Sequence, residues 1–123
     1  MKVHWGRVVV AAILFEAALF AITIVLTLFM DIQAFLPFVP AVVFVVGFPF
    51  GMWVARKPAS GFVLHGVLVG VVATIIYFGL VVGQGISVTE VMNMYGPIPF
   101  FLANALKILG CVAGAYVAGR RRA

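Results

Sequence analysis

Four long apolar stretches alternate with short, more polar connections along this chain. The stretches cover residues 8–30, 35–55, 62–82 and 98–118. Each is close to the ~20 residues that a helix needs to cross the ~30 Å hydrocarbon core of a bilayer. None alternates polar and apolar residues at a period of two, which is the pattern of a membrane strand. The pattern therefore predicts four membrane helices.

The composition agrees with this prediction. The chain has 123 residues, of which 66% are hydrophobic and 9% are charged. Soluble domains carry about 25% charged residues, so the composition excludes an ordinary water-soluble fold. We predict an all-α, integral membrane four-helix bundle in which residues 1–123 form one transmembrane domain. The first stretch exceeds the ~7–15 apolar residues of a signal peptide, so we expect it to be retained.

Basic residues mark one side of the predicted bundle. They lie before the first stretch, between the second and third, and after the fourth, whereas the other two connections hold Asp31 and Glu90 and no lysine or arginine. The positive-inside rule then places both termini in the cytoplasm of a cell whose inner membrane the chain crosses. The net charge of +5 indicates contact with anionic lipids and not with nucleic acid, because the basic clusters adjoin apolar spans.

Three aromatic residues fall at the same boundary as these basic clusters. Trp and Tyr side chains are enriched where a membrane meets water. We expect the following residues to anchor the chain at the lipid interface: Trp5, Arg7, Trp53, Arg56, Lys57, Tyr116, Arg120, Arg121 and Arg122.

The connection after the third stretch carries a helix start signal. Ser87 precedes Glu90 by three residues, which is the spacing of a capping box. We expect a short interfacial helix over residues 87–95, before Gly96 and Pro97.

Glycines spaced four apart recur in the last three stretches, which allows two helix backbones to approach closely. We predict that three of these pairs pack helices: Gly47 with Gly51, Gly66 with Gly70, and Gly110 with Gly114. A further pair, Gly79 and Gly83, has the same spacing. The four pairs together predict a compact bundle, and any one of their glycine faces could be left for a neighbouring chain.

The two halves of the chain also resemble each other. Residues 47–56 and 110–120 both hold the glycine pair, then an aromatic residue, then Val-Ala and a basic residue. A weaker echo relates His4 and the residues that follow it to His65. Either a duplicated helical hairpin with both copies in the same orientation or convergence at membrane boundaries accounts for the likeness.

Only two full charges, Glu16 and Lys107, lie inside the apolar stretches. A charge at the centre of a span costs about 2.5–3.5 kcal/mol on insertion scales. At 1.5 Å per residue they lie roughly 13 Å and 19 Å from the cytoplasmic boundary. Three explanations stay open: the charges pair within the chain, each faces another subunit, or Glu16 titrates in a transport cycle.

Other polar residues in the spans suggest modest roles. We expect Asn104, one turn from Lys107, to hydrogen-bond that lysine or a neighbouring backbone group, and membrane threonines to bond back to their own helices. No serine–histidine, paired-aspartate or metal-ligand set falls at membrane depth, so we predict no enzyme activity, metal or cofactor.

Two resemblances to known proteins follow from these motifs. The segment from Ala11 to Glu16, with a carboxylate in the middle of the first of four short spans, is similar to small multidrug resistance transporters. In that family the glutamate binds protons and cationic substrates in a dimer. The full chain resembles uncharacterised small four-span bacterial membrane proteins, through residues 5–16, 53–57 and 65–70 and the basic tail.

These features together suggest two functions. The first is a non-enzymatic accessory or structural subunit of a larger membrane complex, which predicts unlike membrane chains as partners in preference to a homodimer. The second is a small homo-oligomeric, proton-coupled transporter that uses Glu16, which predicts a cavity lined by Glu16, Thr23, Tyr77 and Asn104.

Overall fold

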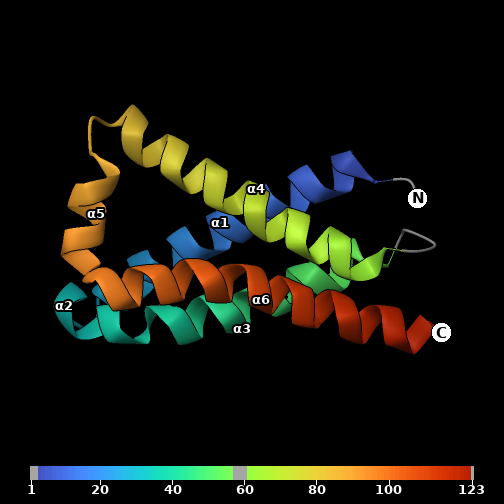
Figure 1. The fold of residues 1–123 in the computed structure, drawn as a ribbon. Coiled ribbons are helices and arrows are strands. Elements are labelled where there is room, and N and C mark those ends of the chain that lie inside the picture. Colours follow the sequence, from blue (N-terminus) through green and yellow to red (C-terminus); the bar gives the residue numbers. More distant parts are fainter. Residues whose placement is uncertain (1–2, 57–60, 123) are drawn as a thin grey trace.

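The protein is all-α in the part of the chain that the structure describes, residues 3–56 and 61–122 of a computed structural model. Two long helices lead away from the end where the termini lie, and two return to it (Figure 1). The elements are α1 (Trp5–Thr27), α2 (Ile32–Phe35), the 3₁₀ turn η1 (Leu36–Phe38), α3 (Val39–Val54), α4 (Phe62–Gly83), α5 (Val88–Tyr95) and α6 (Pro97–Arg122).

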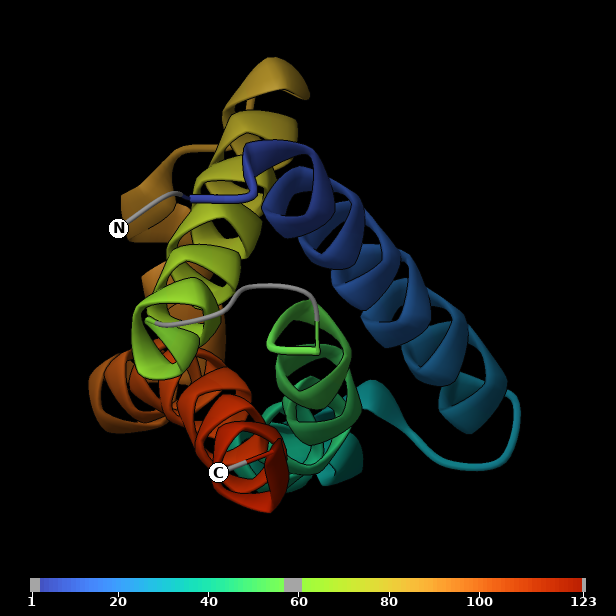
Figure 2. The ribbon, with the colours of Figure 1, turned by 90° about the vertical axis from the view of Figure 1, so that its right-hand side faces the viewer.

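The four longer helices differ in how closely they pack against one another. Helices α3 and α6 lie side by side along most of their length and share the most extensive contact in the molecule, followed by α4 with α6. Helix α1 packs on α4 and α3 near the termini and diverges from them toward its other end (Figure 2). We call the end that holds the termini the terminal end, and the opposite one the α5 end.

Among the residues that the structure describes, three helices are long and apolar enough to cross a membrane: α1, α4 and α6. The prediction of a continuous helix over 35–55 is wrong. Helix α3 has 16 residues, which gives about 24 Å at 1.5 Å per residue. The chain before it forms α2 and η1, because Pro37 and Pro40 remove two backbone donors and favour a break or a first turn at this point.

The short helix predicted over 87–95 is confirmed. Ser87 is the N-cap of α5, and its hydroxyl accepts a hydrogen bond from the Glu90 backbone N–H at 3.1 Å. The helix ends at Gly96, whose φ of 90° is a conformation that glycine adopts without steric cost. Helix α5 thereby bridges the separated ends of α4 and α6 (Figure 1).

Glycines bring the α3 and α6 backbones into direct contact. A methyl group placed on Gly51 would overlap the Cys111 carbonyl, and one on Gly114 would overlap the Phe48 carbonyl. A methyl group on Gly110 would lie 2.5 Å from the Phe44 carbonyl oxygen. Small residues permit this approach, and Cα–H···O contacts add to the dispersion attraction. The close packing predicted for these glycines is confirmed.

Helix α6 meets α4 in the same manner, but only over half of α4. A methyl group on Gly66 would lie 2.7 Å from the Cys111 carbonyl oxygen, and one on Gly70 would lie 2.6 Å from the Ile108 Cα. Gly79 and Gly83, nearer the α5 end, have no neighbouring atom within 4 Å of such a methyl group. Their spacing is the same, but the helix has diverged from α6 by that point.

Positions that correspond in the two halves of the chain meet in space. The alignment that pairs Gly51 with Gly114 also pairs Phe48 with Cys111. Gly51 faces the Cys111 carbonyl and Gly114 faces the Phe48 carbonyl, so the two contacts are reciprocal. The other corresponding helices, α1 and α4, are also in contact. Reciprocal contacts are the pattern that two-fold symmetry produces.

Candidate functional site

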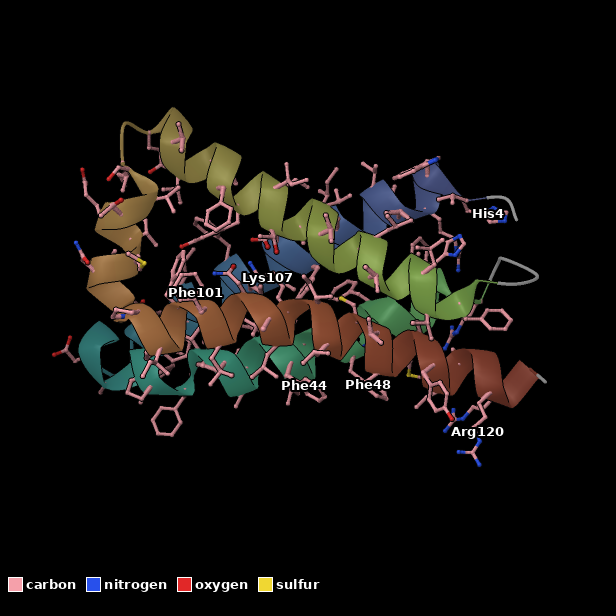
Figure 3. The ribbon with its side chains drawn as sticks, in the orientation of Figure 1. His4, Phe44, Phe48, Phe101, Lys107 and Arg120 are labelled. Atoms are coloured by element: carbon pink, nitrogen blue, oxygen red, sulfur yellow. The ribbon has the colours of Figure 1, made fainter. Side chains whose placement is uncertain are left out.

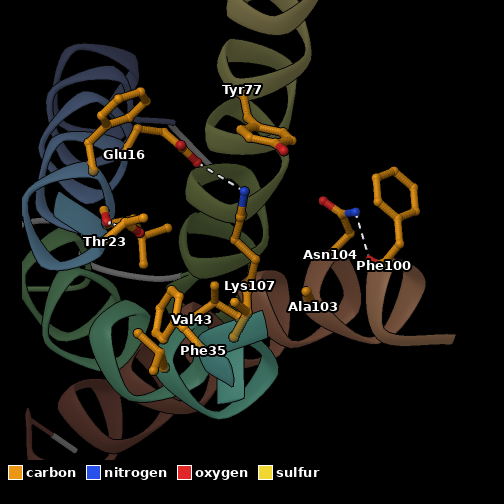
Figure 4. A pocket seen from close by; sticks show the side chains of 13 residues that line it. Glu16, Thr23, Phe35, Val43, Tyr77, Phe100, Ala103, Asn104 and Lys107 are labelled. Carbon is orange, nitrogen blue, oxygen red and sulfur yellow. Dashed lines mark hydrogen bonds and ion pairs between the residues drawn. The ribbon is translucent and has the colours of Figure 1, made fainter. Parts of the chain in front are cut away.

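The two charges inside the apolar stretches meet near the middle of the bundle. Glu16 is the central residue of α1, and its Oε1 lies 3.1 Å from the Lys107 Nζ of α6 (Figure 4). The side chains are 8% and 6% exposed, respectively. The structure therefore shows the pairing within one chain that was one of the three explanations for these charges.

A tyrosine completes the surroundings of the lysine. The Lys107 Nζ lies 4.6 Å from the centre of the Tyr77 ring of α4, which is a cation–π distance. The spacing of 61 residues that relates His4 to His65 also relates Glu16 to Tyr77. Lys107 thus lies between two corresponding positions of the repeat, and the difference between carboxylate and phenol makes the site asymmetric.

This arrangement links side chains of three helices, α1, α4 and α6. The desolvation of two buried charges costs several kcal/mol per ion, and their attraction offsets this cost only when the geometry is good. Removal of one partner would leave an uncompensated charge, whereas removal of both can be nearly neutral. The pair therefore specifies how α1 docks against α6 more than it stabilises the fold.

A cavity of about 230 Å³ adjoins the pair. Its polar wall consists of Glu16, Thr23, Tyr77, Asn104 and Lys107, and the rest of the lining is apolar. The four residues that a transport cavity was predicted to contain, Glu16, Thr23, Tyr77 and Asn104, all line it. The apolar lining comes from α1, α2, α3 and α6: Leu19, Phe20, Phe35, Val39, Val42, Val43, Phe100 and Ala103.

Two uncharged polar residues of the cavity, Thr23 and Asn104, bond to their own helices, as predicted. The Asn104 Nδ2 donates to the Phe100 carbonyl at 2.9 Å, the second of the two expected partners. The Thr23 hydroxyl donates to the Leu19 carbonyl at 2.8 Å. The Asn104 amide oxygen points away from Phe100, toward the side of Lys107 (Figure 4). This amide oxygen is a hydrogen-bond acceptor at the cavity wall.

The predicted lipid anchors gather at the terminal end. Trp5 and Tyr116 are 55% and 54% exposed, and Arg56, Arg120 and Arg121 are exposed. Arg120 lies at this end, well away from Lys107 in the middle of the bundle (Figure 3). Lys57 lies outside the described residues, and the side chain of Arg122 is likewise not described.

Two other predicted anchors bind each other. An Nη of Arg7 donates to the Trp53 carbonyl at 2.6 Å, and its guanidinium carbon lies 3.8 Å from the centre of the Trp53 ring. This pair joins the start of α1 to the end of α3. Sequence spacing alone does not indicate it, because the two residues are 46 positions apart.

A histidine contact at the terminal end was also missed. His65 is fully buried, and its Nε2 accepts a hydrogen bond from the His4 backbone N–H at 3.2 Å. Its Nδ1 lies 2.7 Å from the Gly61 carbonyl oxygen and must carry the proton in this bond. Both ring nitrogens of a neutral His65 are therefore used. The weak echo between the two histidines was the only sequence signal that related them.

The chemistry of the described residues contains no cluster suited to a metal. Among residues 3–56 and 61–122, no group of three or more His, Cys, Asp or Glu side chains lies close together. Comparisons of the chain with models of protein families, with curated proteins and with solved structures find no match. The functional argument therefore depends on the geometry of this molecule.

Proposed function

We propose that this chain is a multi-pass protein of a bacterial inner membrane and a non-enzymatic accessory subunit of a larger complex. Its three long apolar helices support the membrane location. The basic residues Arg7, Arg56 and Arg120 share the terminal end, and Asp31 and Glu90 belong to the connections at the α5 end. This distribution supports cytoplasmic termini by the positive-inside rule, with α3 as the fourth span.

The reciprocal glycine contacts support a further part of this proposal, a duplicated helical hairpin. Independent helices that merely share aromatic and basic ends have no reason to place corresponding residues against each other. Two copies of one hairpin related by an axis along the membrane normal produce that arrangement directly.

The observation that carries the subunit proposal is the unoccupied glycine pair of α4. Gly79 and Gly83 have the spacing that packs helices elsewhere in this chain, yet no atom of another described element lies within 4 Å of a methyl group placed on either. The side chains beside them are large, apolar and exposed: Ile75 at 64%, Leu80 at 49% and Val82 at 57%. A small-residue groove bordered by such side chains fits a transmembrane helix of another protein.

A test compares two matched glycine substitutions. Gly79→Leu fills the groove, whereas Gly6→Leu adds the same side chain at another glycine whose added methyl group contacts nothing. Native mass spectrometry of the tagged protein, extracted in mild detergent, should show unlike membrane chains with the wild type and Gly6→Leu and lose them with Gly79→Leu. Unlike chains that persist in Gly79→Leu, or a homodimer in all three samples, would refute the proposal.

A second candidate function, proton-coupled transport, is favoured by the cavity. Its polar wall holds the only carboxylate of the described spans, and Glu16 occupies the position that suggested a resemblance to small multidrug resistance transporters. This candidate predicts proton flux in proteoliposomes, measured with an internal pH-sensitive dye, that Glu16→Gln abolishes. Equal flux in the wild type and Glu16→Gln would exclude it.

A further inference from the structure

The polar end of the cavity retains hydrogen-bonding capacity. An ammonium group has three N–H donors and a carboxylate has two acceptor oxygens. Lys107 contacts one oxygen of Glu16 and the face of Tyr77, so at least one donor remains for a ligand. Because Lys107 lines the cavity, this donor is available to a group inside it. A hydrogen-bond acceptor on a ligand is therefore the complementary group.

The electrostatics of the site select an uncharged ligand. Glu16 and Lys107 neutralise each other, and both are buried. A ligand with a net charge would break this balance in a region of low dielectric constant, where an unpaired charge costs the most. A neutral group with a polarised oxygen, such as a carbonyl, can accept from Lys107 and leave the pair intact. Charge-assisted hydrogen bonds of this kind are stronger than neutral ones.

The remaining walls suit a ring. Phe20, Phe35, Tyr77 and Phe100 all line the cavity, and aromatic side chains favour stacked or edge-on contacts with other rings. The volume of about 230 Å³ is many times the roughly 10–15 Å³ that one water molecule needs. Since most of the lining is apolar, water is a poor occupant of this space.

The cavity is accessible from the apolar exterior of the bundle. Phe20 lines it and is 55% exposed on the surface of α1. Both α1 and α3 contribute lining residues to this part of the cavity, including Leu19 and Val42. A ligand that is dissolved in the membrane can therefore enter between them.

We propose that this cavity binds an uncharged, membrane-dissolved lipophile whose ring carries a carbonyl group, which is the chemistry of a quinone. The carbonyl oxygen accepts a hydrogen bond from Lys107 beside the Glu16 carboxylate. The ring lies among the aromatic side chains, and an alkyl tail extends along the α1–α3 opening. This site is separate from the partner surface around Gly79 and Gly83 on α4. The proposal concerns binding alone, and no chemical step of the quinone is implied.

The location is tested with a photoreactive azido-benzoquinone that carries a decyl tail, in phosphatidylcholine nanodiscs. The wild type should be labelled at cavity residues, saturably and in competition with unlabelled decyl benzoquinone. Ala103→Phe fills the cavity and should abolish this labelling. Ala105→Phe is the matched control, because Ala105 is exposed on the same helix, and should keep it. If Ala103→Phe does not fold, Ala103→Leu takes its place.

Equal labelling of the Ala103 and Ala105 variants, or labelling spread over exposed residues such as Ile13 and Ile75, would overturn the proposal. Non-saturable labelling would do so as well, since it indicates that lipid tails fill the space.

The chemistry is tested by competition among ligands with the same decyl chain. Decyl benzoquinone should displace the probe, whereas decylammonium and decanoate, both charged at mildly alkaline pH, should not. Displacement by decylammonium or decanoate with equal or greater strength would overturn the assignment to an uncharged ligand.

The hydrogen bond is tested with a variant that removes both charges, Glu16→Gln with Lys107→Met. It should bind decyl benzoquinone about tenfold more weakly, as expected for the loss of a hydrogen bond to a charged donor. Unchanged affinity in a folded double variant would refute the role of Lys107.

Discussion

The two halves of α6 meet their neighbours in different ways. In the half toward the terminal end, Gly110 and Gly114 place the backbone of α6 directly against α3, and Gly66 of α4 closes on the Cys111 carbonyl. In the half toward the α5 end, Lys107 and Phe100 border a cavity. One helix therefore combines direct backbone contact in one half with a cavity beside the other half.

The two halves of α6 also differ in how they determine the arrangement of the helices. In the glycine half, an added methyl group at Gly51, Gly110 or Gly114 would meet a backbone carbonyl, so these contacts determine that α3 and α6 are neighbours. The charge pair acts in the other half, where shape alone would allow α1 to move. Variants in each half should therefore fail for different reasons, and the following predictions are ordered by the size of the expected effect.

The largest effect is expected from a larger side chain in the glycine half. Gly51→Val places atoms where the Cys111 carbonyl lies. Overpacking costs about 1–3 kcal/mol where side chains can yield, and a backbone carbonyl cannot. We expect little folded protein after extraction, measured as the monodisperse fraction on size exclusion. Full recovery of a wild-type peak would show that α3 and α6 do not touch at this point.

A smaller but still large effect is expected from the loss of one charge. Lys107→Met leaves Glu16 buried and unpaired, which should reduce the free energy of unfolding by about 3–5 kcal/mol. Unfolding by SDS in mixed micelles measures this change. The double variant Glu16→Gln with Lys107→Met is the control and should recover most of the loss. If the single and double variants are equally unstable, the two residues do not act as a pair.

The N-cap of α5 should contribute less, and only locally. Ser87→Ala removes the hydroxyl that accepts from Glu90, which typically costs about 1 kcal/mol. Hydrogen exchange should show faster opening of α5 with unchanged protection in α3 and α6. Accelerated exchange throughout the bundle would mean that α5 supports the glycine half too.

The smallest effect is expected at the glycine pair that nothing contacts. In the isolated chain, Gly79→Ala should leave stability unchanged or raise it by up to about 1 kcal/mol, because alanine favours helix more than glycine. The same SDS titration detects the change. A clear destabilisation would reveal that the α5 end of α4 packs more closely than the structure shows.

Much of the glycine half could be predicted from sequence. Glycines at a spacing of four report directly on backbone approach, and the positions 47, 51, 66, 70, 110 and 114 all pack as expected. The spacing alone could not show that Gly79 and Gly83 lack a neighbouring helix, because glycine positions along one helix do not report where that helix diverges from another.

For the candidate site, the sequence predicted the charged pair but not the contacts around it. Two opposite charges at comparable depth suggested a pair, and the pair exists. The cation–π contact with Tyr77 and the aromatic walls depend on helix rotation, which hydropathy does not specify when nearly every position is apolar. Arg7 with Trp53, and His4 with His65, were missed for a related reason: each contact links residues that are far apart in sequence and near a helix end.

The shortness of α3 has a consequence for the surrounding lipid. A helix of 16 residues covers roughly 6 Å less than a ~30 Å hydrocarbon layer. On our proposal that α3 is the fourth span, the lipids beside it meet a shorter helix than those beside α1 and α6, so one side of the molecule imposes hydrophobic mismatch on the bilayer. Mismatch costs fractions of a kcal/mol per Å. That cost falls in thinner membrane and when a neighbouring protein covers α3, which gives the chain a preferred environment without any specific lipid contact.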